Sequence, residues 1–127
     1  MRDLLLVGAG GFAGSVARYL VGGWVTQLAA GARMPFGTLA VNALGCLVIG
    51  VVGALAEQRD LFGAPLRLLL FTGVLGGFTT FSAFGYETFF LVREQRWGLA
   101  ALSIALHLVI ALPCVWLGFR LGGLMAR

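Results

Sequence analysis

The chain has 127 residues, of which 60% are hydrophobic and 11% are charged, and its formal net charge is +4 at pH 7. A soluble globular domain needs more polar surface than this composition supplies, so the sequence is that of an integral membrane protein. Its basic residues are all arginines, and they are scattered along the chain. This distribution lacks the basic cluster of a nucleic-acid interface, so we expect the chain to contact lipid and no nucleic acid.

Four apolar stretches are each long enough to cross the hydrocarbon core as a helix, which takes about 20 residues. They predict transmembrane helices over residues 4–25, 37–56, 66–91 and 98–119. The connections between them are too short to fold alone, so residues 1–127 are predicted to form a single all-α transmembrane domain. The first stretch also resembles a signal peptide, but Arg18 and the apolar residues that follow it predict an uncleaved helix.

The arginines near the ends of these helices indicate how the chain inserts, because the side with more of them tends to stay in the cytoplasm. With four spans, one side of the membrane has five arginines and the other has three. The five are Arg2, Arg59, Arg67, Arg120 and Arg127, and the three are Arg33, Arg93 and Arg96. So small a bias permits insertion in both directions, which makes an antiparallel homodimer possible. Insertion in a single direction is the alternative.

The first predicted helix contains glycines that match two different patterns. Gly8, Gly10 and Ala13 satisfy the G-x-G-x-x-A pattern of a dinucleotide site. That site needs an acidic residue about 20 residues later, but no acidic residue occurs between Asp3 and Glu57. Small residues four apart, as in Gly10 and Gly14, instead predict close helix packing.

Arg18 is an ionisable residue inside the same helix. It either faces a polar route through the protein or extends its side chain to the lipid headgroups.

Thr38 and Asn42 lie four residues apart in the second helix, so both side chains are expected on one face. They form either an interhelical clamp or the polar lining of a pathway. Cys46 in this helix and Cys114 in the fourth lack the spacing of a metal site, and we interpret both as small apolar fillers.

The third helix contains the segment GGFTTFSAFGYETFF, residues 76–90, which is unusually polar and aromatic for a membrane span. Gly76 and Gly77 are expected to weaken the helix, and the hydroxyls of Thr79 and Thr80 compete for backbone groups, so a break is predicted between Gly76 and Thr80. Backbone carbonyls released at such a break can bind a cation.

Phe81 and Phe84 follow this break and lie one turn apart, with Ser82 between them and Glu87 further on. Two phenylalanines are ordinary packing residues. However, the edge of a phenyl ring is positive, so rings beside hydroxyl and amide donors can coordinate a small dehydrated anion. A full positive charge in this low dielectric would hold the anion too tightly for conduction.

These segments resemble one known family. The stretches GVLGGFTTFSAFGYE, GTLAVNALGCLVIG, GFAGSVARY and VWLG are similar to those of the Fluc, or CrcB, family of bacterial fluoride channels. The resemblance implies a dual-topology antiparallel homodimer in the bacterial inner membrane, with two fluoride pathways and a structural sodium ion at the dimer axis. It also implies passive export that lowers the concentration of fluoride in the cytoplasm and hence its toxicity.

The resemblance also implies roles for individual residues. The backbone carbonyls of Gly76 and Thr79 match the sodium ligands, Arg18 matches a position that attracts anions, and Glu87 matches one that supports the polar route. The residues expected along the anion pathway are Thr38, Asn42, Thr80, Phe81, Ser82, Phe84, Ser103 and His107.

Four positions depart from the family pattern, and they are Cys46, Ala83, Ser103 and His107. His107 stands where serine is usual. As a lone histidine it is either a packing residue or a group that makes conduction vary between pH 5 and 8.

Three other classes of protein were compared with this pattern. A proton-coupled exporter of the small multidrug resistance type needs a carboxylate in its first span, where this chain has Arg18. A scaffold subunit would not need donors and phenylalanines around one helix break. An enzyme is excluded because the sequence offers no Ser-His-acid set and no cluster of metal ligands.

Overall fold

A computed structural model describes residues 1–58 and 62–126, and every regular element in these two ranges is a helix. Four helices are long and apolar enough to cross a membrane, over Arg2–Leu28, Phe36–Glu57, Ala64–Arg93 and Trp97–Met125. Each predicted range lies inside one of them, so the expectation of an all-helical, four-span chain is confirmed. Arg59 and Arg127, two of the five arginines counted on one side, lie outside the described residues.

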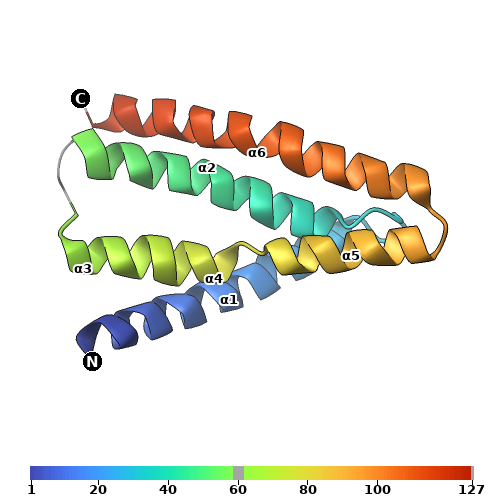
Figure 1. The fold of residues 1–127 in the computed structure, drawn as a ribbon. Helices are drawn as coiled ribbons and strands as arrows, with labels where there is room; N and C mark the ends of the chain where they lie inside the picture. Colours follow the sequence, from blue (N-terminus) through green and yellow to red (C-terminus); the bar gives the residue numbers. More distant parts are fainter. Residues whose placement is uncertain (59–61, 127) are drawn as a thin grey trace.

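The first, second and fourth spans are single helices, and the third is composed of several elements (Figure 1). The single helices are α1 (Arg2–Leu28), α2 (Phe36–Gln58) and α6 (Trp97–Met125). The third span consists of α3 (Ala64–Arg67), the π-helix η1 (Leu68–Leu75), α4 (Gly76–Phe78) and α5 (Phe81–Arg93).

Between α4 and α5 the backbone is extended for two residues. Thr79 has φ −81° and ψ 156°, and Thr80 has φ −151° and ψ 112°. Thr80 also begins α5, since its side chain accepts a hydrogen bond of 3.1 Å from the Ala83 N–H. Gly76, by contrast, is helical with φ −63° and ψ −36°. The extended residues are therefore the two threonines and not this glycine.

Close backbone contacts explain many of the glycines. A Cβ added to Gly14 would overlap the Val74 carbonyl oxygen, and one added to Gly77 would lie 2.5 Å from the Gly11 carbonyl oxygen. α1 therefore packs directly against η1 and α4. Between α2 and α6, a Cβ on Gly118 would overlap the Leu47 carbonyl oxygen. The small residues thus bring helices into contact, as expected for membrane interfaces.

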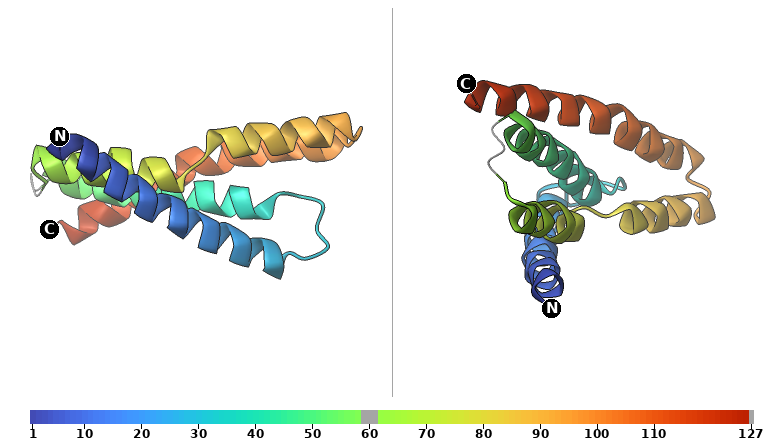
Figure 2. Two further views of the ribbon diagram at one scale, coloured as in Figure 1. Left: turned by 90° about the horizontal axis from the view of Figure 1, so that it is seen from below. Right: turned by 60° about the vertical axis from the view of Figure 1, so that its left-hand side comes forward.

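α5 lies apart from this closely packed part of the subunit. Figures 1 and 2 show α2 and α6 running side by side, while α5 continues beyond the crossing of α1 and α4 and approaches α6 near the start of that helix. Several of its aromatic side chains are exposed, with Phe81 at 82%, Tyr86 at 66% and Phe89 at 59%. The arrangement leaves an open space between α5 and the α2–α6 pair.

Candidate functional site

A cleft of about 770 Å³ lies between α2, α5 and α6, and we call it the central cleft. Five residues predicted for the anion pathway line it, namely Asn42, Thr80, Phe81, Phe84 and His107. They come from three helices and the extended segment, so the fold brings together residues that lie far apart in the sequence.

Three rings lie in a row along this cleft. The centroids of Phe81 and Phe84 are 5.4 Å apart with planes tilted by 53°, and those of Phe84 and His107 are 4.3 Å apart with a tilt of 41°. Tilted rings present their positive C–H edges beside a neighbouring face instead of stacking flat. The three rings therefore line the cleft together with the Thr80 and Asn42 side chains.

Asn42 bonds to the extended segment with both ends of its amide. Oδ1 accepts from the Thr80 N–H at 2.8 Å, and Nδ2 donates to the Thr80 carbonyl oxygen at 3.0 Å. Of the two roles considered for Asn42, the structure shows the interhelical clamp. The amide has a second N–H that neither bond uses, so the clamp leaves one donor for a ligand.

The extended segment also leaves the carbonyl groups of Gly76 and Thr79 without their usual helical N–H donors. In a continuous helix the Thr80 N–H would bond to the Gly76 carbonyl, but here it donates to Asn42. The Ala83 N–H would likewise bond to the Thr79 carbonyl, but it donates to the Thr80 hydroxyl. The carbonyls of Gly76 and Thr79 therefore lose their helical donors. Both residues line the central cleft.

A second cleft, of about 390 Å³, adjoins the same segment from the side of α1. Arg18, Thr38, Thr80 and Glu87 line it, and Thr80 lines the central cleft as well. The Thr38 hydroxyl donates to Glu87 Oε1 at 2.6 Å, while Glu87 Oε2 is buried and has no partner. The two charged positions predicted from the sequence thus share this cleft, and Thr80 lines both clefts.

Two predicted pathway residues lie in neither cleft. The Ser82 hydroxyl is 3.2 Å from the Thr80 hydroxyl, so it is next to the site but does not line it. Ser103 is fully buried, and its hydroxyl has no partner. Its backbone carbonyl is 2.9 Å from Nδ1 of His107, and this contact connects Ser103 to the site.

Other lining residues were not among the predicted pathway residues. Thr88 lines the central cleft with a buried hydroxyl that has no partner. It comes four residues after Phe84, so helical spacing could have identified it. Tyr19 and Thr26 line the second cleft, and their separation of seven residues places them on one face of α1.

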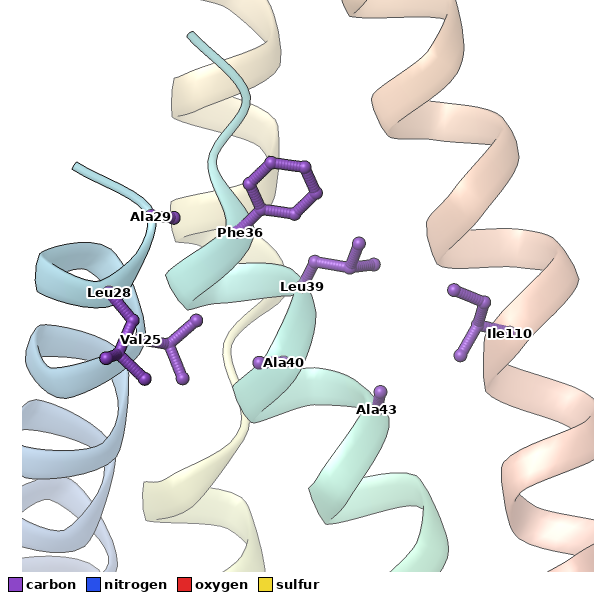
Figure 3. A pocket seen from close by; sticks show the side chains of 8 residues that line it. All are labelled: Val25, Leu28, Ala29, Phe36, Leu39, Ala40, Ala43 and Ile110. Carbon is purple, nitrogen blue, oxygen red and sulfur yellow. The ribbon is translucent and has the colours of Figure 1, made fainter. Parts of the chain in front are cut away.

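A third hollow, of about 450 Å³, has an entirely different lining (Figure 3). Its side chains come from α1 and the residue after it, from α2 and from Ile110 of α6, and all of them are apolar. Such a lining offers nothing to an ion. Within residues 1–58 and 62–126 there is also no group of three or more His, Cys, Asp or Glu side chains that could hold a metal ion.

Comparison with known proteins gives consistent matches over nearly the whole chain. Residues 5–119 match the family described as CrcB-like protein, Camphor Resistance (CrcB). A protein of Methylobacillus flagellatus is 46% identical over 121 residues, which cover 95% of this chain and 94% of the relative. One of Chlorobaculum tepidum is 48% identical over 124 residues, covering 98% and 97%. Both relatives are named fluoride-specific ion channel FluC.

Proposed function

The chain belongs to the CrcB family, and from this membership we propose that it is a fluoride-specific ion channel. The observation that supports this most strongly is the similarity to proteins of that name over almost the full length of both chains. The protein is a multi-pass protein of the bacterial inner membrane and not an enzyme.

Passive conduction is sufficient for fluoride export. Hydrogen fluoride is a weak acid, so its neutral form crosses lipid and ionises in a cytoplasm that is less acidic than the surroundings. A channel that passes only the anion lets fluoride drain out down its gradient. The cytoplasmic concentration of fluoride falls as a result, and with it the toxicity.

The pathway that we propose connects the two clefts. Fluoride would contact the ring edges of Phe81 and Phe84, pass the free N–H of Asn42 and the Thr80 hydroxyl, and reach Thr38 in the second cleft, where Glu87 orients the Thr38 hydroxyl. The support is that Thr80 lines both clefts. Weak ring-edge and hydroxyl contacts replace water around the ion without holding it, which is what conduction requires.

Arg18, Ser82 and Ser103 would have indirect roles in this pathway. Arg18 in the second cleft attracts the anion towards the entrance. Ser82 supports the orientation of the Thr80 hydroxyl, to which it lies close. Ser103 acts through the carbonyl that orients the His107 ring.

The second part of the proposal is an antiparallel homodimer of dual topology. The weak arginine bias permits insertion both ways round. The central cleft is open on the surface of one subunit, and the Phe81 side chain on its lining is 82% exposed. A second copy packed over α5 would close the cleft and cover this ring.

The third part is a structural sodium ion. The carbonyls of Gly76 and Thr79 fit such an ion, because both have lost their helical donors and hard cations prefer oxygen ligands. One subunit supplies two of these oxygens, so a symmetric dimer would supply four. The ion would fix the extended segment and stabilise the contact between the subunits.

The decisive experiment reconstitutes the purified protein into liposomes and measures efflux with ion-selective electrodes, first for fluoride and then for chloride. We expect rapid fluoride efflux, with chloride efflux close to that of protein-free liposomes. Equal rates for both anions would contradict the proposal. Proton-driven efflux of a cationic drug, without fluoride flux, would instead support the small multidrug resistance type of exporter.

A further inference from the structure

The position of the His107 ring is fixed by two contacts. Phe84 lies against its face, with centroids 4.3 Å apart, and Nδ1 is 2.9 Å from the Ser103 carbonyl oxygen. A carbonyl oxygen can only accept a hydrogen bond, so Nδ1 must be the donor. In the neutral imidazole the single proton is therefore on Nδ1, and Nε2 has a lone pair.

Nε2 itself is buried and has no hydrogen-bond partner. His107 lines the central cleft and also a small cavity of about 10 Å³, and Asn42 is the other polar residue of this cavity. The remaining lining is apolar and consists of Leu39, Ala43, Ile110 and Ala111. A volume of this size holds about one water molecule. A bare fluoride ion is of similar size.

We propose that His107 and Asn42 form a fluoride site that fills only when His107 is protonated. The inference rests on the proposed function, because fluoride would reach this cavity from the central cleft. In the neutral ring the Nε2 lone pair repels an anion. In the protonated ring Nε2 donates a hydrogen bond, and the second N–H of Asn42 provides another. The imidazolium and fluoride then form a pair of zero net charge.

Each helix packed around this site carries another titratable group. Glu87 on α5 lines the second cleft, and Cys46 on α2 lines the central cleft. On α6 itself, Cys114 follows His107 by seven residues. A Glu87 carboxylate would also favour the protonated ring, so the contribution of Glu87 must be separated from that of fluoride by experiment.

Proton and anion binding at one site are thermodynamically linked. If protonation raises the fluoride affinity by a given factor, fluoride raises the proton affinity by the same factor. Coupling of this kind typically amounts to about 5-fold or more. The protonated site is filled at lower fluoride concentration, and it releases the ion more slowly because of its charge.

The tautomer and the linkage can be measured directly, because His107 is the single histidine of the chain. The full-length protein is labelled with [15N]histidine, and its two ring nitrogens are followed by NMR from pH 5 to 8. The series is run in sodium fluoride and in sodium gluconate of equal ionic strength. We expect the Nδ1–H tautomer at high pH, and a titration midpoint that moves to higher pH in fluoride. An Nε2–H tautomer, or equal midpoints, would overturn the proposal.

Variants separate the effect of Glu87 on the protonation of His107 from the effect of fluoride. In Glu87→Gln the difference between the midpoints in fluoride and in gluconate should remain. In liposomes, the wild type should show a half-saturating fluoride concentration about 5-fold lower at pH 5.5 than at pH 7.5, and a lower maximal flux. Leakage of hydrogen fluoride is subtracted with protein-free liposomes. His107→Ser and His107→Gln should lose this pH dependence, and its persistence in both would contradict the proposal.

The channel function and the His107–Asn42 fluoride site can be contradicted separately. A folded protein can bind fluoride without conducting it. A titration midpoint of His107 that depends on fluoride, without fluoride flux at any pH, would support the His107–Asn42 site and contradict the channel function. A protein that conducts fluoride with the same kinetics at pH 5.5 and 7.5 would keep the channel and refute the site.

Discussion

Asn42 holds both backbone groups of Thr80, accepting from its N–H at 2.8 Å and donating to its carbonyl at 3.0 Å. Asn42→Ala would remove both hydrogen bonds, at about 0.5–1.5 kcal/mol each. We expect fluoride flux to be lost and the thermal midpoint of the purified protein to fall. Asn42→Asp separates the two bonds, because a carboxylate can accept from the N–H but cannot donate. Flux in Asn42→Ala equal to wild type would contradict both the clamp and the pathway role.

The hydrogen bond from Thr38 to Glu87 gives a second prediction. Thr38→Val keeps the shape of the side chain but removes the donor, and a bond to a carboxylate contributes about 1.5–3 kcal/mol. We expect fluoride flux to fall by about tenfold or more. Thr38→Ser keeps the hydroxyl and is the matched control, with flux close to wild type. Loss of flux in both variants would indicate a steric requirement instead of the hydrogen bond.

The glycines of α1 give a stability prediction with a control in the same helix. A Cβ at Gly14 would overlap the Val74 carbonyl oxygen, whereas a Cβ at Gly8 would meet nothing within 4 Å. Gly14→Ala should therefore destabilise the protein by about 1–3 kcal/mol or more, because α1 must move away from η1. Gly8→Ala should be nearly neutral. Thermal unfolding of both variants in one detergent checks this, and equal midpoints would contradict the close contact.

Phe81 is predicted to act on conduction through its ring edge. Phe81→Ile keeps an apolar side chain at this exposed position but removes the positive ring edge. Fluoride efflux should be strongly suppressed, while size-exclusion chromatography with light scattering still gives the wild-type oligomer. Phe89→Ile, on the same helix and outside the central cleft, is the control. Undiminished flux in Phe81→Ile would return this residue to an ordinary packing role.

Dual topology predicts that two inactive variants can restore each other. Two lysines inserted after Arg2 bias the chain towards one orientation, and two inserted between Arg93 and Arg96 bias it towards the other. Each variant expressed alone should lose fluoride flux, because its copies all insert the same way. Co-expression should restore flux. Full activity of either variant alone would show that one orientation is sufficient.

The sequence predicted the four helices, but not the contacts between them. Composition and apolar length determine a membrane span, and helical spacing places Thr38 with Asn42. Spacing on one helix cannot show which residue of another helix lies opposite, so the bond from Asn42 to the Thr80 backbone was not predicted. The contact of Gly77 with the Gly11 backbone was likewise not predicted.

Ser103 shows that the sequence does not reveal which side chains neighbouring helices cover. The resemblance implied that Ser103 and His107, four residues apart on one helix, both lie along the anion pathway. The structure buries Ser103 completely and uses its backbone carbonyl to orient the histidine ring. A shared helical face does not determine which side chains reach a cleft, because neighbouring helices cover part of that face.

The extended pair Thr79–Thr80 also makes the third span sensitive to its exact length. Each extended residue advances the chain by about 3.3 Å and reverses the direction of the next side chain, whereas a helical residue advances it by about 1.5 Å. A deletion of one residue here would shift α5 and turn its phenylalanines away from the α2–α6 pair. Substitutions of single side chains at this junction should therefore be tolerated more readily than insertions or deletions of residues.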